Sequence, residues 1–372
     1  MTTILCDAVP FCFGPVSKMI SIAEHLRQPG VKLQLLASGT SLELGSKSGL
    51  FEIKHCNSES TVDLKKRQKS FEGADAFITV MNPEAAKFSL KLGIPTIYVD
   101  SLFWMWDVIP KQLYGADRYF IQNFSDSKAV LRKHSGLRNA EIVGPIIDDS
   151  LGIEKKKEDY LLVNFGGMES SLIQVGKNSR YPFVVGKIVA QALAETKQKA
   201  YFCGNNKIVR KAISRNPRSR WVGGKSHKAF LEILRKAKGM LTIPGLTSTF
   251  EAFYYEVPLV FLPPENYSQF LNLHILRNGG TAPRAFHWSD VYPNLNVRPH
   301  ENEKEGVRKV LRCIKKFEAD KVAQKKFKDY LVESLEGDKV RTVLRQKNYL
   351  NSLGKNSAKK IADYVLEKAR AG

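Results

Sequence analysis

Short apolar runs alternate with amphipathic segments along most of the chain. In the first 150 residues, the runs Thr3–Val9 and Val31–Ala37 predict buried strands, and Ser17–Arg27 between them has its apolar positions at helical spacing. The same pattern predicts, in chain order, the strand Asp75–Val80, the helix Asn82–Leu92 and the strands Thr96–Val99, Arg118–Gln122 and Glu141–Val143. Because strands that alternate with helices pair in parallel, this part predicts a doubly wound α/β domain.

A polar stretch, Asp148–Asp159, interrupts the alternation and is typical of a linker. A second series follows it, with strands expected at Tyr160–Phe165, Ala200–Cys203, Arg220–Val222, Leu241–Ile243 and Val257–Leu262, and helices at Tyr181–Glu195 and Lys228–Lys236. From about residue 304 onward the pattern is helical only. We therefore predict two Rossmann-like, doubly wound parallel-sheet domains, residues 1–150 and 151–350, and a C-terminal helix in 351–372 that packs back on the N-terminal domain.

The loops that follow the predicted strands are the places to look for a site, because ligands of parallel sheets bind beyond the carboxyl ends of the strands. In two such domains these loops are expected to face each other across a cleft. The loops that meet this condition are Pro10–Ser17, Asp100–Trp106, Phe165–Ser171, Trp221–Ser226, Pro244–Thr249 and Pro263–Gln269.

Length and composition agree with a two-domain protein. A chain of 372 residues exceeds what one small core needs. It has no apolar run of ~18 residues, which argues against a membrane-spanning helix, and no basic segment precedes the first apolar run, which argues against a secretory leader. The five cysteines are scattered without a Cys-x-x-Cys pair, which predicts reduced thiols, a cytoplasmic location and no metal site.

Positive charge is concentrated in two segments of a chain whose net charge is +21. Residues 207–238 contain eleven Lys and Arg against one acidic residue, and residues 301–372 contain nineteen against eleven. The second segment is typical of a solvated helical surface. The first adjoins the loop Pro244–Thr249 in sequence, and it predicts attraction of an anionic substrate or peripheral contact with a membrane surface.

The stretch Leu241–Leu273 has the strongest chemical pattern. A β-prone run is broken by Pro244-Gly245, and a helix follows. The hydroxyl side chains expected to cap that helix are Thr247, Ser248 and Thr249. Unpaired N–H groups and the positive end of the helix dipole then point at the turn, which makes it an anion site. A second loop expected at the same sheet edge contains Gly166, Gly167 and Ser170.

Residues Ile243–Ala252 resemble the donor-binding signature of glycosyltransferases with the GT-B fold, which commonly reads His-x-Gly-x-x-Ser/Thr-x-x-Glu. Gly245, Ser248 and Glu251 fall on that spacing. The segment from Val257 to Asn272 resembles the continuation of the signature. Other segments that resemble this superfamily are Asp75–Thr79, Leu92–Ile97 and Val143–Ile146.

The resemblance implies a GT-B enzyme that moves a sugar from a nucleotide-diphosphate sugar, such as a UDP-sugar, to an acceptor without a metal. In the family, the glycine and hydroxyl residues hold the diphosphate, the glutamate holds the ribose and the glutamine holds the donor sugar. The residues that take these roles here are Gly245 and Ser248, then Glu251, then Gln269. The expected donor site is completed by Gly166, Gly167, Ser170, Thr247, Thr249 and the main chain of Val222, which would read the nucleobase.

Three positions depart from the family pattern. Ile243 stands where a phosphate-binding His is usual, Pro15 replaces the His of an N-terminal Gly-His-Val loop, and Ser268 stands where an acid is common. An inverting transfer to a hydroxyl needs a proton acceptor, so another residue must supply the base. The catalytic candidates are carboxylates near strand ends, Asp7 and Asp100 first and then Asp107 and Glu169.

Aromatic residues near these carboxylates predict an acceptor platform, because flat rings stack on sugars or bases. The expected acceptor contacts are Phe11, Gly14, Trp104 and Trp106, and core packing is the alternative for the two tryptophans. The acceptor class stays open among small molecules, glycans and lipid-linked sugars. His227 is expected at the surface, and Cys12 lacks a nearby histidine that would make it a nucleophile.

Two other functions stay open from the sequence. With the loop histidine missing, the same fold can serve a nucleotide-sugar hydrolase or 2-epimerase. A non-catalytic nucleic-acid-binding protein or partner subunit would use the basic segment, but it leaves the spacing of Gly245, Ser248 and Glu251 unexplained. Nucleic acid is therefore not an expected partner.

Overall fold

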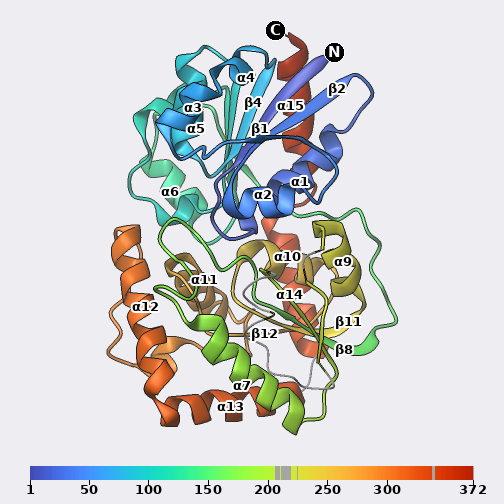
Figure 1. Ribbon diagram of the computed structural model, residues 1–372, viewed down its shortest axis with the longest axis vertical. Helices are drawn as coiled ribbons and strands as arrows, with labels where there is room; N and C mark the ends of the chain where they lie inside the picture. The colour runs from blue at the N-terminus through green and yellow to red at the C-terminus, as the bar shows by residue number, and fades with distance from the viewer. Residues whose placement is uncertain (206–209, 211–218, 224, 337–339, 372) are drawn as a thin grey trace. The chain divides into compact units, whose positions relative to one another are not determined.

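The computed structural model describes residues 1–205, 210, 219–223, 225–336 and 340–371. The chain divides into two compact units, one of Met1–Asp148 with Asn351–Gly372 and the other of Asp149–Leu350. Each unit is built around its own parallel sheet (Figure 1).

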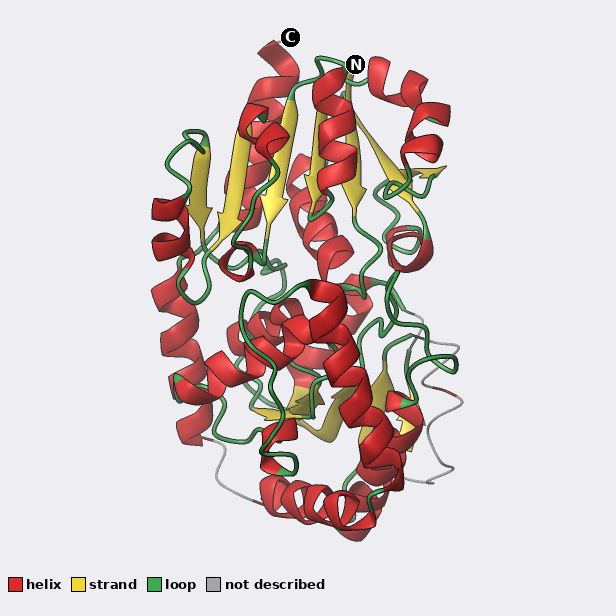
Figure 2. Ribbon diagram, turned by 90° about the vertical axis from the view of Figure 1, so that its left-hand side faces the viewer, coloured by secondary structure: helices red, strands yellow, loops and turns green. Residues whose placement is uncertain are grey.

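The first unit holds a seven-stranded sheet in the order β3-β2-β1-β4-β5-β6-β7, with every neighbouring pair parallel. Its strands are β1 (Thr2–Ala8), β2 (Val31–Ala37), β3 (Glu52–His55), β4 (Ala76–Val80), β5 (Thr96–Asp100), β6 (Arg118–Gln122) and β7 (Ala140–Val143). Its helices are α1 (Gly14–Leu26), α2 (Gly39–Gly45), α3 (Thr61–Lys66), α4 (Gln68–Glu72), α5 (Pro83–Lys91), α6 (Ser127–Lys133), α15 (Ser357–Ala371) and the 3₁₀ turns η1 (Phe103–Met105) and η2 (Lys111–Gly115). Helices cover both faces of this sheet (Figure 2), and the strand order reverses between β1 and β4.

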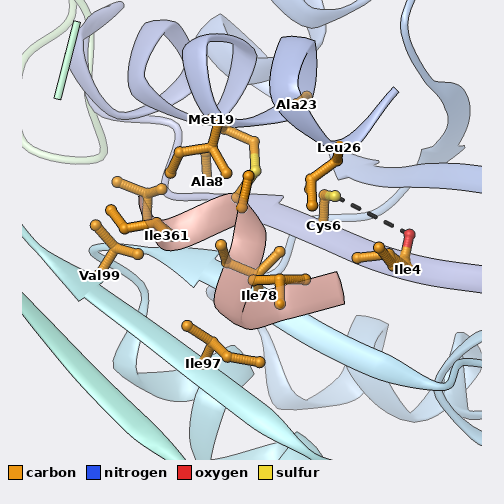
Figure 3. Packing of buried hydrophobic residues seen from close by; sticks show 14 of the residues in the cluster. Ile4, Cys6, Ala8, Met19, Ala23, Leu26, Ile78, Ile97, Val99 and Ile361 are labelled. Carbon is orange, nitrogen blue, oxygen red and sulfur yellow. Dashed lines mark hydrogen bonds between the residues drawn. The ribbon is translucent and has the colours of Figure 1, made fainter. Parts of the chain in front are cut away.

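Alternate residues of β1 face opposite sides of the sheet. Ile4, Cys6 and Ala8 lie in an apolar cluster formed with α1 and α15 (Figure 3). Leu5 lies in a second cluster, on the side of α3, α4 and α5. Asp7 follows the alternation of Leu5, so its carboxyl group is buried on that second side with 0% of the residue exposed.

The C-terminal helix α15 belongs to the first unit. Its Ile361 is fully buried in the cluster that contains the alternate residues of β1. The chain reaches α15 through Gly354, and a Cβ on Gly144 would lie 2.5 Å from the Gly354 carbonyl carbon, so only glycine fits at position 144. The Tyr364 hydroxyl donates a hydrogen bond of 3.0 Å to the main-chain oxygen of Asp117. These contacts hold α15 on the N-terminal sheet.

The second unit holds a five-stranded parallel sheet in the order β10-β9-β8-β11-β12. Its strands are β8 (Glu158–Asn164), β9 (Ala200–Cys203), β10 (Ser219–Trp221), β11 (Ala237–Thr242) and β12 (Leu259–Phe261). Its helices are α7 (Tyr181–Glu195), α9 (His227–Lys236), α10 (Leu246–Tyr254), α11 (Tyr267–Asn278), α12 (Glu303–Ala319), α13 (Lys321–Glu336), α14 (Val340–Leu353), which continues into the first unit, and the 3₁₀ turn η3 (Trp288–Asp290). Helix α13 packs against α7, where Lys328 Nζ lies 2.5 Å from Glu195 Oε2.

The doubly wound architecture expected from the sequence is confirmed, and the differences are local. Strand β3 was not expected, because Glu52–His55 is a polar edge strand with no fully buried residue. Strand β11 begins at Ala237 and not at Leu241, because the weak strand formers before Met240 pair with β8 all the same. None of the helices in the described part of the chain is long and apolar enough to cross a membrane.

Candidate active site

The loops after β8 and β11 meet at one edge of the second sheet, and Asn164 joins them. Its Nδ2 donates to Thr242 Oγ1 at 3.2 Å, and its Oδ1 accepts from the N–H of Gly166 at 3.0 Å. Its main-chain oxygen accepts from the N–H of Ile243 at 3.3 Å. The two glycine loops predicted at one sheet edge therefore lie side by side, held by a buried amide.

Ile243, at the position where the family commonly has a histidine, lies against the Gly166 loop. Gly166 has a φ of +61°, and a Cβ there would be 3.2 Å from Ile243 Cδ1. Ile243 is 3% exposed, so its side chain fills the space under the loop. An aliphatic side chain offers no hydrogen bond to a phosphate, which leaves main-chain N–H groups and neighbouring hydroxyls for that purpose.

The turn before α10 presents two residues to solvent. Gly245 is the N-cap residue of α10, and the N–H of Thr249 donates to its carbonyl oxygen at 3.1 Å. Gly245 and Ser248 are partly exposed, whereas Thr247 and Thr249 are buried. The expectation that hydroxyl side chains cap this helix was wrong: α10 begins at Leu246, before all three of them, and has no side-chain cap.

Glu251 is buried beside a histidine. Its Oε1 lies 2.7 Å from His227 Nε2, and the exposed fractions of the two side chains are 2% and 4%. Its Oε2 makes no hydrogen bond with any residue that the structure describes. The surface location expected for His227 was wrong, because the residue opens α9 behind the capping Ser226 and turns inward. No sequence spacing marked this pair, since 24 positions separate its members.

The loop after β12 is held by hydrogen bonds of α11. Gln269 Oε1 accepts from the N–H of Glu265 at 2.9 Å, and Asn266 Oδ1 accepts from the N–H of Gln269 at 3.0 Å. Gln269 is 4% exposed, and its Nε2 is bonded to no other described residue. Glu265 is 0% exposed with both carboxyl oxygens unbonded in the described part of the chain, and burial raises its pKa well above the usual range. Glu265 was not among the site residues expected from the sequence; its signal was an acid placed directly after Pro263-Pro264.

The remaining donor-site candidates lie at the same edge, and some of their polar groups already make hydrogen bonds within the protein. Ser170 Oγ accepts from the N–H groups of Leu172 and Ile173 at 3.2 and 3.1 Å. The N–H of Val222 donates to the Phe202 oxygen at 3.0 Å, while Gly167 is buried. Residues 206–209, 211–218 and 224 of the basic segment lie outside the described residues.

Asp7 and Asp100 are both buried in the first unit, on strands that β4 separates. Thr79 Oγ1 donates to Asp7 Oδ2 at 2.6 Å, and the nearby Asn82 Nδ2 donates to Ser58 Oγ at 2.9 Å. Burial raises the pKa of the Asp7 carboxyl to about 6, against the lowering effect of the polar groups around it, and Oδ1 has no hydrogen-bond partner among the described residues.

Asp100 is tied to its own loop. Its Oδ2 accepts from the Tyr119 hydroxyl at 2.7 Å, and its Oδ1 accepts from the N–H of Leu102 at 2.8 Å. Burial raises its pKa to about 6 as well, and the hydrogen bonds from Tyr119 and Leu102 oppose that rise. Tyr119 belongs to the cluster against which Trp106 packs, so this carboxylate and this aromatic candidate lie in the same part of the unit.

The other acceptor candidates are divided between core and surface. Trp104 is 5% exposed and packs edge-on against Phe124, with ring centroids 5.4 Å apart. Trp106 is partly buried in a different cluster, which includes Tyr119. Phe11, in the segment that joins β1 to α1, and Gly14, the first residue of α1, are partly exposed. Of these four, only Trp104 lies fully in the core.

No protein-family model and no curated protein match the sequence. No group of three or more His, Cys, Asp or Glu suited to a metal ion occurs among the described residues.

Three solved structures are similar to this chain from end to end. A UDP-glucosyltransferase from Polygonum tinctorium, described as capable of glucosylating indoxyl, is 14% identical with a TM-score of 0.56 and covers 100% of this chain and 99% of its own. UGT2 of Phytolacca americana, complexed with UDP-2-fluoro-glucose and pterostilbene, is 14% identical with a TM-score of 0.54 and full coverage of both chains, 100% and 100%. The glycosyltransferase of kitacinnamycin is 12% identical with a TM-score of 0.53 and covers 99% of each. At this identity the likeness shows the fold, and the GT-B architecture expected from the sequence is confirmed.

Proposed function

We propose that the chain transfers a sugar from a UDP-sugar to an acceptor. The observation that carries the proposal is the arrangement at the carboxyl edge of the second sheet, in a chain with the GT-B fold. There Gly245 and Ser248 are accessible at a helix N-terminus, and Glu251 keeps one carboxylate oxygen unbonded. The complex of UGT2 with UDP-2-fluoro-glucose supports the choice of donor.

The diphosphate is proposed to lie at the N-terminus of α10. Main-chain N–H groups and the helix dipole stabilise negative charge there, and the Ser248 hydroxyl, now 3.4 Å from the Gly245 oxygen, can turn to a phosphate. Gly166 allows the neighbouring loop to approach as bare backbone. These groups would stabilise the charge that develops on the leaving diphosphate, which is the main electrostatic demand of glycosyl transfer.

Glu251 Oε2 is proposed to accept hydrogen bonds from the ribose hydroxyls. His227 occupies Oε1 at 2.7 Å, so the carboxylate is fixed in orientation with only one oxygen left for a ligand. Gln269 is proposed to donate from Nε2 to a hydroxyl of the donor sugar, since its Oε1 is already used by the loop. The carbonyl of Val222 is proposed to accept from the nucleobase.

Asp7 is proposed as the proton acceptor for the acceptor hydroxyl, ahead of Asp100. Both have a pKa of about 6, which suits a general base near neutral pH. Asp100 is bound by a main-chain N–H and a tyrosine, so freeing it would disrupt a loop. Asp7 accepts a hydrogen bond from the Thr79 hydroxyl at Oδ2, and its Oδ1, unbonded among the described residues, is left for a substrate hydroxyl. Phe11 and Gly14, on the segment after β1, are proposed to contact the acceptor.

Binding and turnover test the proposal separately. Thermal-shift measurements against UDP, GDP, ADP, dTDP and their sugars are expected to show stabilisation by uridine nucleotides, lost in Glu251→Ala. Glu333→Ala, an exposed position on α13, is the matched control and is expected to behave as the wild type. No stabilisation by any nucleotide would contradict the donor site.

The competing reactions are separated by their products. UDP released only when an acceptor is present indicates transfer, whereas UDP released with water alone indicates the nucleotide-sugar hydrolase. A changed configuration at C2 of the recovered sugar, seen by proton NMR, indicates the 2-epimerase. Either of the last two results would overturn the proposed transfer while leaving the donor site intact.

A further inference from the structure

A pocket of about 550 Å³ lies in the first unit, beyond the carboxyl ends of β2 and β3. Its walls come from the start of α2, the segment after β3 and the end of α3. The volume is in the range of small-molecule sites. None of the residues discussed above for donor, base or acceptor lines it, so the roles proposed so far do not account for the pocket.

Positive charge dominates the pocket wall. Lys66 and Arg67 line it from the end of α3, with Asp63 as the acidic lining residue. Lys66 Nζ lies 2.8 Å from Asp63 Oδ1, so these two charges largely neutralise each other. Arg67 is left as the unbalanced charge of the wall, and an anion is the ligand it favours.

Arg67 is oriented by the pocket itself. Its Nε donates to the main-chain oxygen of His55 at 3.0 Å, while its two terminal nitrogens bond to no described residue. The residue is only partly exposed, so its rotation is restricted. A guanidinium held by Nε presents its outer edge as a fork that matches the two oxygens of a carboxylate or phosphate.

Another part of the pocket wall carries an apolar group. Leu42 of α2 lines the pocket and is also partly buried against the cluster of β1 and α1. A ligand that combines an anionic end with an apolar body would satisfy both parts of the wall, because the body would cover Leu42 while the anion met Arg67.

The pocket adjoins the segment after β1. A Cβ on Gly39 would lie 3.4 Å from Pro10 Cβ, and the N–H of Cys56 is fixed to the Ala37 oxygen at 3.0 Å. Asp7 of β1 pairs in register with Leu36 of β2, the residue before the lining Ala37. The pocket therefore lies next to the strand end that carries the carboxylate proposed as the base.

We propose that this pocket extends the acceptor site beyond Phe11 and Gly14, and that the acceptor is a small hydroxylated organic acid. Its anionic group is held by Arg67 and its apolar body covers Leu42. The assignment of the ligand as an acceptor rests on the proposed function, but binding of the acid to the pocket can be measured without a sugar donor. It names a substrate class that the three structural neighbours do not indicate.

The test compares an acid with its neutral ester. 4-Hydroxybenzoate and methyl 4-hydroxybenzoate are titrated into the full-length protein by isothermal calorimetry, with inorganic phosphate as a second anion. The acid is expected to bind at least about tenfold more tightly than the ester, as the loss of a charge-assisted pair predicts. Arg67→Gln is expected to abolish that preference and to leave ester binding unchanged.

Arg132→Gln is the matched control, because Arg132 is an exposed arginine on α6 of the same unit, away from the pocket wall. Competition by phosphate against 4-hydroxybenzoate would assign the site to phosphate esters as well as carboxylic acids. Equal affinity for acid and ester, equal loss in both arginine variants, or no binding of either anion would overturn the proposal.

UDP binding, measured in parallel, separates the two proposals. Arg67→Gln is expected to leave the thermal shift by UDP unchanged, since Arg67 belongs to the other unit. Absence of UDP binding with intact acid binding would contradict the proposed function and leave the anion pocket standing. Intact UDP binding without acid binding would contradict the anion pocket and leave the proposed function standing.

Discussion

Replacing His227 by leucine would remove the partner of a buried carboxylate in the second unit. The side chains of His227 and Glu251 are 4% and 2% exposed and meet at 2.7 Å. Water therefore cannot replace the histidine without opening the core around α9 and α10. The substitution would leave Glu251 without its one hydrogen-bond partner among the described residues.

The magnitude follows from that burial. A hydrogen bond to a charged group contributes about 1.5–3 kcal/mol, and a buried polar group left without a partner costs about 1–3 kcal/mol, more when it is charged. We expect His227→Leu to lower the free energy of unfolding of the second unit by about 3 kcal/mol. For a unit of this size that corresponds to a fall in Tm of about 6–12 °C. His227→Gln keeps an N–H donor and is expected to lose less than half of this.

Donor binding should fall with stability, because His227 orients the carboxylate proposed to hold the ribose. We expect the Kd for UDP to rise about tenfold in His227→Leu and much less in His227→Gln, with kcat at saturating donor nearly unchanged. Urea unfolding followed by intrinsic fluorescence, with UDP titration below the transition, gives both quantities. A double-mutant cycle with Glu251→Gln should show a coupling of at least about 1 kcal/mol. Additive effects, or a loss under about 0.5 kcal/mol, would refute the reasoning.

Three further predictions concern single groups. The folded pKa of Asp7 is raised to about 6, above its unfolded value, so the folded state favours the protonated form and stability falls as the pH rises from about 4 to 6. Asp7→Asn should flatten that fall, measured by urea unfolding at several pH values, and abolish transfer. An unchanged dependence of stability on pH would contradict this prediction. Glu265→Gln should raise Tm at pH 8 and leave it nearly unchanged at pH 5, because burial raises the pKa of this unbonded carboxyl; a lower Tm at pH 8 would show a missing partner. Gly166→Ala should lower the free energy of unfolding by about 1–2 kcal/mol and weaken UDP binding, because Gly166 has a φ of +61° and an added Cβ would contact Ile243. Gly176 has a φ of +86° with open space around it, so Gly176→Ala should lower stability without changing the affinity for UDP.

The apolar pattern predicted the sheets because parallel strands are buried on both faces and so read as continuous apolar runs. The β1 and β8 runs are of this kind, and both strands lie in the middle of their sheets. Strand β3 escaped prediction because it is an edge strand whose residues are all at least partly exposed. Exposure weakens the apolar pattern without abolishing it, since the edge strands β7 and β10 were predicted.

The donor-binding spacing is visible in the sequence because Gly245, Ser248 and Glu251 lie on one turn and one helix, where local geometry fixes their relation. Contacts between distant segments are not visible in this way. The partnership of His227 with Glu251 depends on how α9 and α10 pack, and a lone histidine after a serine gives no sign of it. The anion pocket likewise depends on where α2 and α3 lie around the end of the sheet.

The return of the C-terminal helix to the first unit has a consequence for synthesis. Residues up to Asp148 leave the ribosome early, but Ile4, Cys6 and Ala8 are then covered by α1 alone. The second helix of their cluster, α15, begins 209 residues later (357 − 148). At about 5–20 residues per second the interval is about 10–40 s. During it, the apolar face that α15 later covers stays open to solvent while the entire second unit is made. The nascent chain must therefore be shielded from aggregation by chaperones or by its own partial collapse, and the first unit is completed last although it is begun first.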